Sequence, residues 1–244
     1  MTFTSTFMLR LKKIRGIISH PTLLRALLQY RVMAGVEHSS ILDRRLATVV
    51  DIGANRGQFA LAARAITDAK IISFEPLLDP ARVFNLVHGG DKYVTLHIAA
   101  VGPHLELRKM HVSARDDSSS LLPIADLQSK LFPGTAELAT VDVKVGPLDA
   151  FVRGDEIIAP AMLKLDVQGF EYEALSGCES LLNKFDFIYC ECSFVELYSG
   201  QKLAHDVIEW LHRQQFELIG VFNTAYDSFG QAIQADFLFK RHAS

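Results

Sequence analysis

Hydrophobic positions follow two alternating spacings from residue 47 onward. Short apolar runs have the length of strands: 48–51, 70–75, 93–99, 161–166 and 185–192. Segments with apolar residues at helical spacing lie between or after them: 58–67, 80–88, 171–183 and 203–215. Such alternation is typical of an α/β fold in which helices cover both faces of a parallel sheet.

Two regions interrupt this alternation. Residues 104–150 contain strand-like segments, 105–112 and 138–145, around a polar loop, which predicts an insertion into the domain. Near the end, Phe216–Phe222 and Ala235–Arg241 are two β runs joined by a polar turn. They predict an antiparallel hairpin that closes one edge of the sheet.

The first 45 residues have a different pattern. Residues 7–19 and a segment from Pro21 to about Met33 show amphipathic helical spacing with basic residues between the apolar ones. We therefore divide the chain into a basic helical segment, 1–45, and a main domain, 46–244. The helices are expected to pack as a lid or a homodimer contact. The alternative is a peripheral contact of residues 7–33 with a membrane surface or an acidic partner.

Charge is divided in the same way. Residues 1–36 carry six basic residues and no acid, so the remaining chain, with all 28 acids, has a net charge of -9 although the total is only -3. An acidic body argues against nucleic acid as a partner. No apolar run is long enough for a bilayer, and the three cysteines show no metal-binding spacing. We expect a cytoplasmic protein without a metal site, peripheral at the membrane if its head binds there.

Four predicted strands end in an acidic residue: Asp51, Glu75, Asp166 and Glu191. The carboxyl ends of parallel strands border the ligand crevice of an open α/β sheet. The four carboxyl groups are therefore expected to converge on one cleft.

The turn after the first strand, Asp51–Gly57, predicts a nucleoside site. Its glycines allow close approach of a ligand, and Glu75 follows at the end of the next strand, where an acid can bind both hydroxyls of a ribose. The turn lacks the G-x-G-x-x-G pattern of dinucleotide sites. An acid at Asp51 suits a cationic ligand such as S-adenosylmethionine. The alternative is a tight turn without a ligand, in which Asn55 caps the helix.

Several motifs resemble those of the FkbM family of S-adenosylmethionine-dependent methyltransferases. They are Asp51–Phe59, Phe74-Glu75-Pro76, Ala99–Gly102, Ser118-Ser119-Ser120 and Leu163–Glu171, in the family's order. The resemblance covers residues 47–240 and implies a class I methyltransferase fold, Rossmann-like, with seven strands of which the last is antiparallel. Pro147-Leu148-Asp149 departs from the family, which more often has Thr-Leu-Asp there.

The resemblance also implies roles for individual residues. Those expected to bind S-adenosylmethionine are Asp51, Gly53, Asn55, Gly57, Glu75, Ala99 and Ala100. Asp166 and Glu191 are the candidate catalytic residues, and Ser119, Glu171 and Glu196 are candidate contacts of the acceptor. The alternatives are a helix cap for Asp166, solvated strand ends for Glu191 and Glu196, and an ordinary loop for Ser119.

Asp166 is the first candidate for accepting the proton of an acceptor hydroxyl, or for orienting that acceptor. Methyl transfer from a sulfonium is a direct displacement, so alignment of the reacting atoms supplies most of the catalysis. A carboxylate can take the proton late, particularly if burial raises its pKa. Strand alternation turns Lys164 away from Leu163 and Leu165, where it can pair with an acid. Tyr189 is expected to be a core aromatic residue.

The predicted function is S-adenosylmethionine-dependent O-methylation of a small-molecule or glycan hydroxyl. By resemblance the acceptor is a deoxysugar such as fucose on a glycolipid or oligosaccharide, or a polyketide-type natural product. One rival is a nucleotide-dependent oxidoreductase. The other is a binding module that keeps the cofactor but lacks catalysis.

Overall fold

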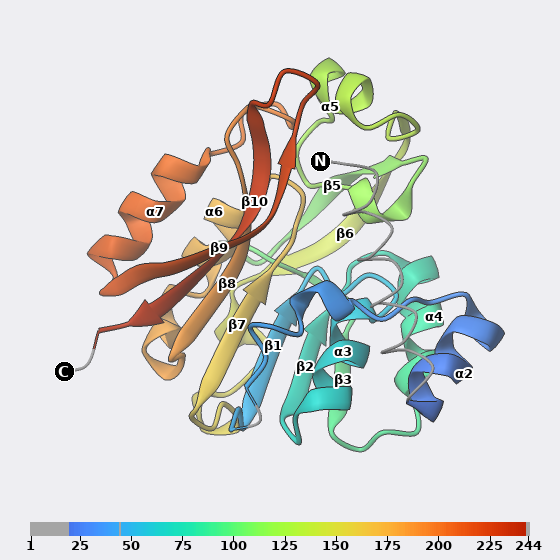
Figure 1. Cartoon of the computed structure of the whole chain (residues 1–244), viewed down its shortest axis with the longest axis vertical. Helices are drawn as coiled ribbons and strands as arrows, with labels where there is room; N and C mark the ends of the chain where they lie inside the picture. The colour runs from blue at the N-terminus through green and yellow to red at the C-terminus, as the bar shows by residue number, and fades with distance from the viewer. Residues whose placement is uncertain (1–19, 44, 243–244) are drawn as a thin grey trace.

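The computed structural model describes residues 20–43 and 45–242, and its centre is one seven-stranded sheet (Figure 1). The strands are β1 (Thr48–Ile52), β2 (Lys70–Phe74), β3 (Val94–His97), β7 (Ala161–Leu165), β8 (Phe187–Ser193), β9 (Phe216–Tyr226) and β10 (Ala232–Arg241). They run in the order β3-β2-β1-β7-β8-β10-β9, and only the pairings of β10 are antiparallel. The predicted class I methyltransferase topology is confirmed, including the C-terminal hairpin.

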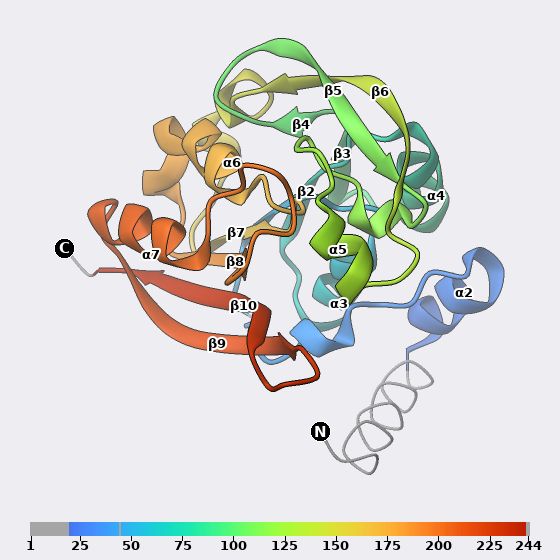
Figure 2. The same cartoon turned by 90° about the horizontal axis from the view of Figure 1, so that it is seen from above.

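Helices cover both faces of this sheet (Figure 2). Alternate strand residues point to opposite sides. Val49 and Met162 pack in one cluster with residues of α3 (Gln58–Ile66) and α4 (Leu78–His88). Val50 and Leu163 pack in another with α6 (Glu171–Gly177) and α7 (Ala204–Arg213). Polar residues later in the same strands therefore also face a known layer.

The chain between β3 and β7 forms a second, three-stranded sheet. Its strands β4 (Ala100–Val101), β5 (Glu106–Ser113) and β6 (Glu137–Gly146) run in the order β4-β6-β5, and α5 (Asp126–Leu131) lies between β5 and β6. The sheet lies beyond the carboxyl ends of β1 and β2 (Figure 1). Short 3-10 turns complete the connections: η2 (Asp116–Ser118), η3 (Leu148–Ala150) and η4 (Gly154–Glu156).

Two predicted elements have different bounds. The third strand was expected to reach Ala99, but β3 ends at His97, and Ala100 instead pairs with Val145 in the second sheet. The helix expected over 171–183 ends at Gly177 and continues as the 3-10 turn η5 (Glu179–Lys184). A Cβ at Gly177 would lie 2.6 Å from the backbone of Gly102, so this close approach requires a residue with poor helix propensity.

The basic N-terminal segment is described in part. The helix expected over residues 7–19 lies outside the described residues. The second helix is α2 (Pro21–Tyr30), shorter than predicted because Arg31 adopts a left-handed conformation; the turn η1 (Val36–His38) follows. Leu23 and Ala26 bury its apolar side against Leu61. No helix in residues 20–43 and 45–242 is long and apolar enough to span a membrane. Peripheral membrane contact through residues 7–33 stays a prediction.

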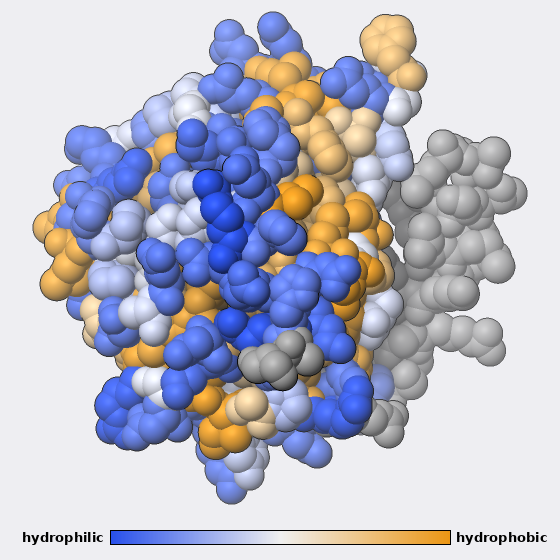
Figure 3. Space-filling view, turned by 90° about the vertical axis from the view of Figure 1, so that its left-hand side faces the viewer, coloured by the Kyte–Doolittle hydropathy of each residue, from blue (hydrophilic) through white to orange (hydrophobic). Residues whose placement is uncertain are grey.

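Strand β9 forms one edge of the main sheet. Figure 3 views the molecule from this side and shows apolar side chains gathered among polar ones. Ile219 and Val221 of β9 are each 49% exposed, and Tyr226 is 58% exposed. The homodimer expected from the sequence stays a prediction.

Candidate cofactor and active site

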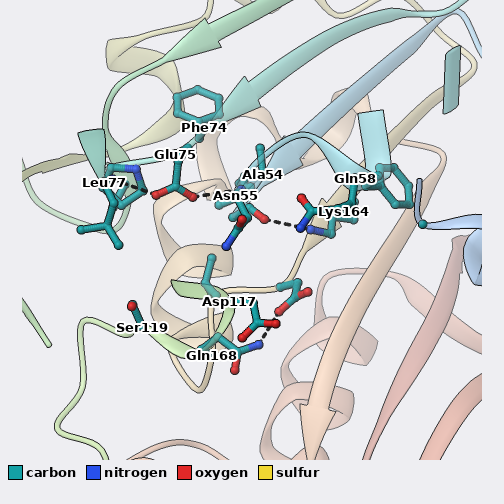
Figure 4. A pocket seen from close by; sticks show the side chains of 18 of the residues that line it. Ala54, Asn55, Gln58, Phe74, Glu75, Leu77, Asp117, Ser119, Lys164 and Gln168 are labelled. Atoms are coloured by element: carbon teal, nitrogen blue, oxygen red, sulfur yellow. Dashed lines mark hydrogen bonds between the residues drawn. The ribbon is translucent and has the colours of Figure 1, made fainter. Parts of the chain in front are cut away.

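A cavity of about 310 Å³ lies at the carboxyl ends of β1, β2 and β7, a size suited to a small ligand. Its walls come from these strand ends, the second sheet, the η2 region and η1. Six of the predicted site residues line it: Gly53, Asn55, Glu75, Ala100, Ser119 and Asp166. Figure 4 shows Glu75 and the turn at Ala54 and Asn55 on one side, with Ser119 and Gln168 across from them.

The turn after β1 owes its shape to two glycines with positive φ. Gly53 has φ +80°, and a Cβ there would lie 1.9 Å from the carbonyl oxygen of Asp166. Gly57 has φ +89°, and a Cβ there would meet the ring of His88 at 2.5 Å. Gly53 therefore joins the turn to the end of β7 beside the cavity. The prediction that Gly57 contacts the cofactor is not supported by its position, because it packs against α4 and does not line the cavity.

Glu75 is held rigidly at the edge of the cavity. Its Oε2 accepts a hydrogen bond from the Asn55 amide at 2.9 Å, and its Oε1 accepts one from the Leu77 amide at 2.7 Å. The side chain is buried, with 5% exposed. Because each carboxylate oxygen can accept more than one hydrogen bond, this group can also accept a pair of hydroxyls. The geometry matches the ribose-binding role predicted for it.

Asp51 lies beneath the turn rather than on the cavity. It is fully buried, and its Oδ1 is 3.0 Å from Nζ of Lys164, which also donates to the Gly53 carbonyl oxygen at 3.1 Å. Burial alone would lower the pKa of Lys164, but Asp51 and Asp166 outweigh it and the pKa is raised. The predicted pairing of Lys164 with an acid is confirmed. The expected direct contact of Asp51 with the cofactor is not found, because the lysine already neutralises its charge.

Asp166 faces the cavity at the end of β7 and is tied to a glutamine. Nε2 of Gln168 donates to Asp166 Oδ1 at 2.6 Å and to Glu191 Oε2 at 3.1 Å, while Gln168 Oε1 accepts from the Tyr198 hydroxyl at 2.8 Å. The N-cap of α6 is Phe170, so Asp166 is not that helix's cap. The carboxylate is therefore held in place from behind and presented to the cavity.

Glu191 lies behind this pair. Its Oε1 accepts a hydrogen bond from Gln234 at 2.7 Å, and it does not line the cavity. Burial, with the neighbouring carboxylates of Asp166 and Asp236, raises the pKa of Glu191 well above its usual range. The prediction that Glu191 acts directly on the acceptor is therefore replaced by a supporting contact through Gln168.

A comparison with known families agrees with this geometry. The family described as Methyltransferase FkbM domain matches residues 51–218. The chain belongs to this family. Its cofactor is accordingly S-adenosylmethionine, as predicted. The chain is also 28% identical over 181 residues, 70% of its length and 68% of the relative's, to the hexuronic acid methyltransferase AglP of Haloferax volcanii.

Solved structures give weaker similarities. An rRNA methylase of Streptococcus thermophilus has a TM-score of 0.46 at 11% identity and covers 85% of this chain and 93% of its own. A precorrin-6y C5,15-methyltransferase of Geobacter metallireducens has a TM-score of 0.45 at 11% identity, with 85% and 86% coverage.

The cavity of this FkbM-family chain fits its cofactor. Glu75 offers acceptors for a ribose, and Ala100, Val101 and Leu121 supply apolar walls for a flat base. Asp166 places negative charge where a sulfonium and an ammonium need it. In the described part of the chain no three His, Cys, Asp or Glu side chains gather as metal ligands.

Three of the remaining predicted residues lie away from the cavity. Ala99 is buried behind it, next to Ala100. Glu196 is exposed and accepts a hydrogen bond from the Gly200 amide. Glu171 is 4% exposed, and its Oε1 accepts hydrogen bonds from the amides of Val167 and Gly169. The acceptor contacts predicted for Glu171 and Glu196 are therefore not supported, because backbone amides already occupy both side chains.

Glu171 gives the fold a pH dependence. Burial raises its pKa from 4.5 to about 7, so the folded state holds this proton more tightly than the unfolded state. Stability contributed by the protonated form is present below pH 4.5 and is lost as pH rises through 7. Glu171→Gln keeps an oxygen for both amides and has no proton to lose. We expect its free energy of unfolding to gain about 2–3 kcal/mol on the wild type between pH 4.5 and 8.

Urea titrations of both proteins across this range measure the difference. A constant difference between the two proteins would show that Glu171 has an ordinary pKa in the fold.

The cavity also contains residues that the sequence did not single out. Gln168 lies within the most specific motif, but its bridging position depends on a backbone φ of 55° that the sequence does not reveal. Asp117 comes from the insertion, and Glu37 and His38 come from η1. No residue spacing could have placed these three at the carboxyl ends of the central strands.

Proposed function

We propose that this chain transfers the methyl group of S-adenosylmethionine to a hydroxyl oxygen of a sugar. The observation that carries the proposal is the arrangement of two fixed carboxylates, Glu75 and Asp166, along one cavity. Glu75 suits the ribose of the cofactor, and Asp166 can accept a hydrogen bond from an acceptor. The relative named for hexuronic acid methylation supports a sugar as the acceptor class.

The chain's own groups would act mainly by positioning. The cofactor supplies a methyl group on a positively charged sulfur. The rigid contacts of Glu75 and of Gln168 with Asp166 fix both ends of the site before binding, which lowers the entropic cost of aligning the acceptor oxygen. Asp166 would orient the acceptor through its hydroxyls. Acceptor specificity would come from the insertion, which contributes Asp117 and Ser119 to the cavity wall.

The first test is methyl transfer to defined sugars. The purified chain is incubated with S-adenosylmethionine and methyl glycosides of glucuronic acid, fucose and glucose, and products gaining one methyl group are found by mass spectrometry. We expect a methyl ether on a ring hydroxyl of at least one glycoside. Cofactor binding without transfer to any glycoside, or a methyl ester in place of an ether, would contradict the proposal.

Glu75→Gln tests the ribose site. The glutamine keeps one oxygen acceptor but loses the charge and one acceptor, so we expect about tenfold weaker binding of S-adenosylhomocysteine. Isothermal titration calorimetry measures this affinity. Glu209→Gln is the control, since Glu209 is an exposed residue of α7. Equal affinities in Glu75→Gln and wild type would place the ribose elsewhere.

A further inference from the structure

A hydrogen-bonded chain of four side chains lies beside the cavity, outside the motifs of the family resemblance. Nδ1 of His38 is 3.0 Å from the Tyr189 hydroxyl, and that hydroxyl donates to Asp236 Oδ2 at 2.8 Å. Nδ2 of Asn223 donates to the same Asp236 oxygen at 2.7 Å. The residues come from η1, β8, β10 and β9, so the tertiary fold alone brings them together.

The direction of these bonds fixes the state of the histidine. Tyr189 has a single hydroxyl proton, which it gives to Asp236, so its oxygen accepts the bond from His38. Neutral His38 therefore carries its proton on Nδ1. Its Nε2 then has a free electron pair, and this nitrogen makes no hydrogen bond within the described part of the chain.

His38 is one of the residues that line the cavity, together with Asp166 and Gln168. Its ring is held between Phe59 and Tyr189, with centroids 5.5 Å from each, and its side chain is 20% exposed. A ring fixed in this way by both packing and a hydrogen bond has one orientation. The position is therefore suited to a precise contact with a bound molecule.

We propose that His38 is the catalytic base that takes the proton of the acceptor hydroxyl, and that Tyr189 and Asp236 are its positioning residues. The inference rests on the proposed function. The acceptor's O–H bond breaks and its proton goes to Nε2 of His38, while the oxygen forms the new bond to the methyl carbon and the sulfur keeps the electron pair of the broken bond. The resulting imidazolium is stabilised through Tyr189 by the carboxylate of Asp236.

The surrounding charges leave His38 neutral in the resting protein. Burial lowers its pKa, against the attraction of Asp236, Glu37 and Asp166, while Lys164 lowers it further. A neutral imidazole is the form that can accept a proton at pH 7. Asp166 has a different task, since its Oδ1 accepts the amide of Gln168 and its carboxylate contacts the acceptor from the β7 side.

Nuclear magnetic resonance of the free protein tests the first half of the proposal. Histidines labelled with 15N are assigned by comparison with His38→Gln. We expect Nδ1 of His38 to carry the proton and Nε2 to show the shift of an unprotonated nitrogen at pH 7. Tyr189→Phe, which keeps the packed ring, should shift this balance toward Nε2–H. A wild-type His38 protonated on Nε2, or charged at pH 7, would overturn the proposal.

Kinetics on the glycoside that accepts methyl groups tests the second half. His38→Gln should lower kcat by about 10²- to 10⁴-fold and remove the loss of rate at acidic pH, with affinity for S-adenosylhomocysteine unchanged. Tyr189→Phe should lower kcat less and shift the acidic limb. His205→Gln, an exposed histidine of α7, is the control. Undiminished kcat in His38→Gln would overturn the base role. No transfer by the wild type would instead overturn the proposed function.

Discussion

Lys164→Met is expected to destabilise the fold by about 3–5 kcal/mol, because it leaves the fully buried carboxylate of Asp51 without its cation. Methionine matches the length of the lysine side chain, so packing changes little. The hydrogen bond from Lys164 to the Gly53 carbonyl is also lost, which loosens the turn at the cavity. Urea unfolding followed by the fluorescence of Trp210, the single tryptophan, measures the loss.

A second variant separates the charge from the space that the lysine fills. Asp51→Asn combined with Lys164→Met removes both charges and should recover at least half of the lost stability. If the double variant is no more stable than Lys164→Met, packing rather than the unpaired carboxylate accounts for the loss. S-adenosylhomocysteine binding by the double variant then reports whether the ion pair itself shapes the cavity.

Periodicity was sufficient to predict most of this fold. β1, β2, β7 and β8 are short apolar runs buried on both faces, and few other structures suit such runs. The predictions were wrong where a contact far along the chain decides the outcome. The helix ends at Gly177 because of Gly102, and Ala100 leaves the main sheet because of Val145.

The candidate site was predictable where one residue acts at a strand end. Gly53, Glu75 and Asp166 all reach the cavity, since a strand end in a parallel sheet has a known place. The position of Asp51 was not predictable, because it depends on the register that sets Lys164 directly opposite on β7. That register neutralises the acid that the sequence had assigned to the cofactor.

His38 and Tyr189 show a different limit of the sequence. Tyr189 is a buried aromatic residue as predicted, with 2% exposed, yet its hydroxyl links η1 to β10. The two residues are 151 positions apart, and neither belongs to a motif. Only the packing of η1 over the face of β8 makes them partners.

Asp166→Asn is expected to lower kcat by about 10²- to 10³-fold while affinity for S-adenosylhomocysteine stays the same. Asparagine keeps the shape of the side chain and an oxygen for the amide of Gln168, so the turn is preserved. The charge that orients the acceptor is lost. Initial rates on the accepting glycoside, with calorimetry for the cofactor product, measure both quantities. Asp155→Asn, at an exposed ion pair with Arg153, is the control.

The pH profile of Asp166→Asn distinguishes the two carriers of the proton. If His38 takes the proton, the variant is slower at every pH, but its rate still falls at acidic pH as the imidazole becomes charged. If Asp166 takes the proton, the acidic limb disappears in Asp166→Asn and remains in His38→Gln. We expect the first result, because the hydrogen bonds of Tyr189 and Asp236 give His38 an unprotonated nitrogen, whereas Asp166 already accepts a hydrogen bond from Gln168.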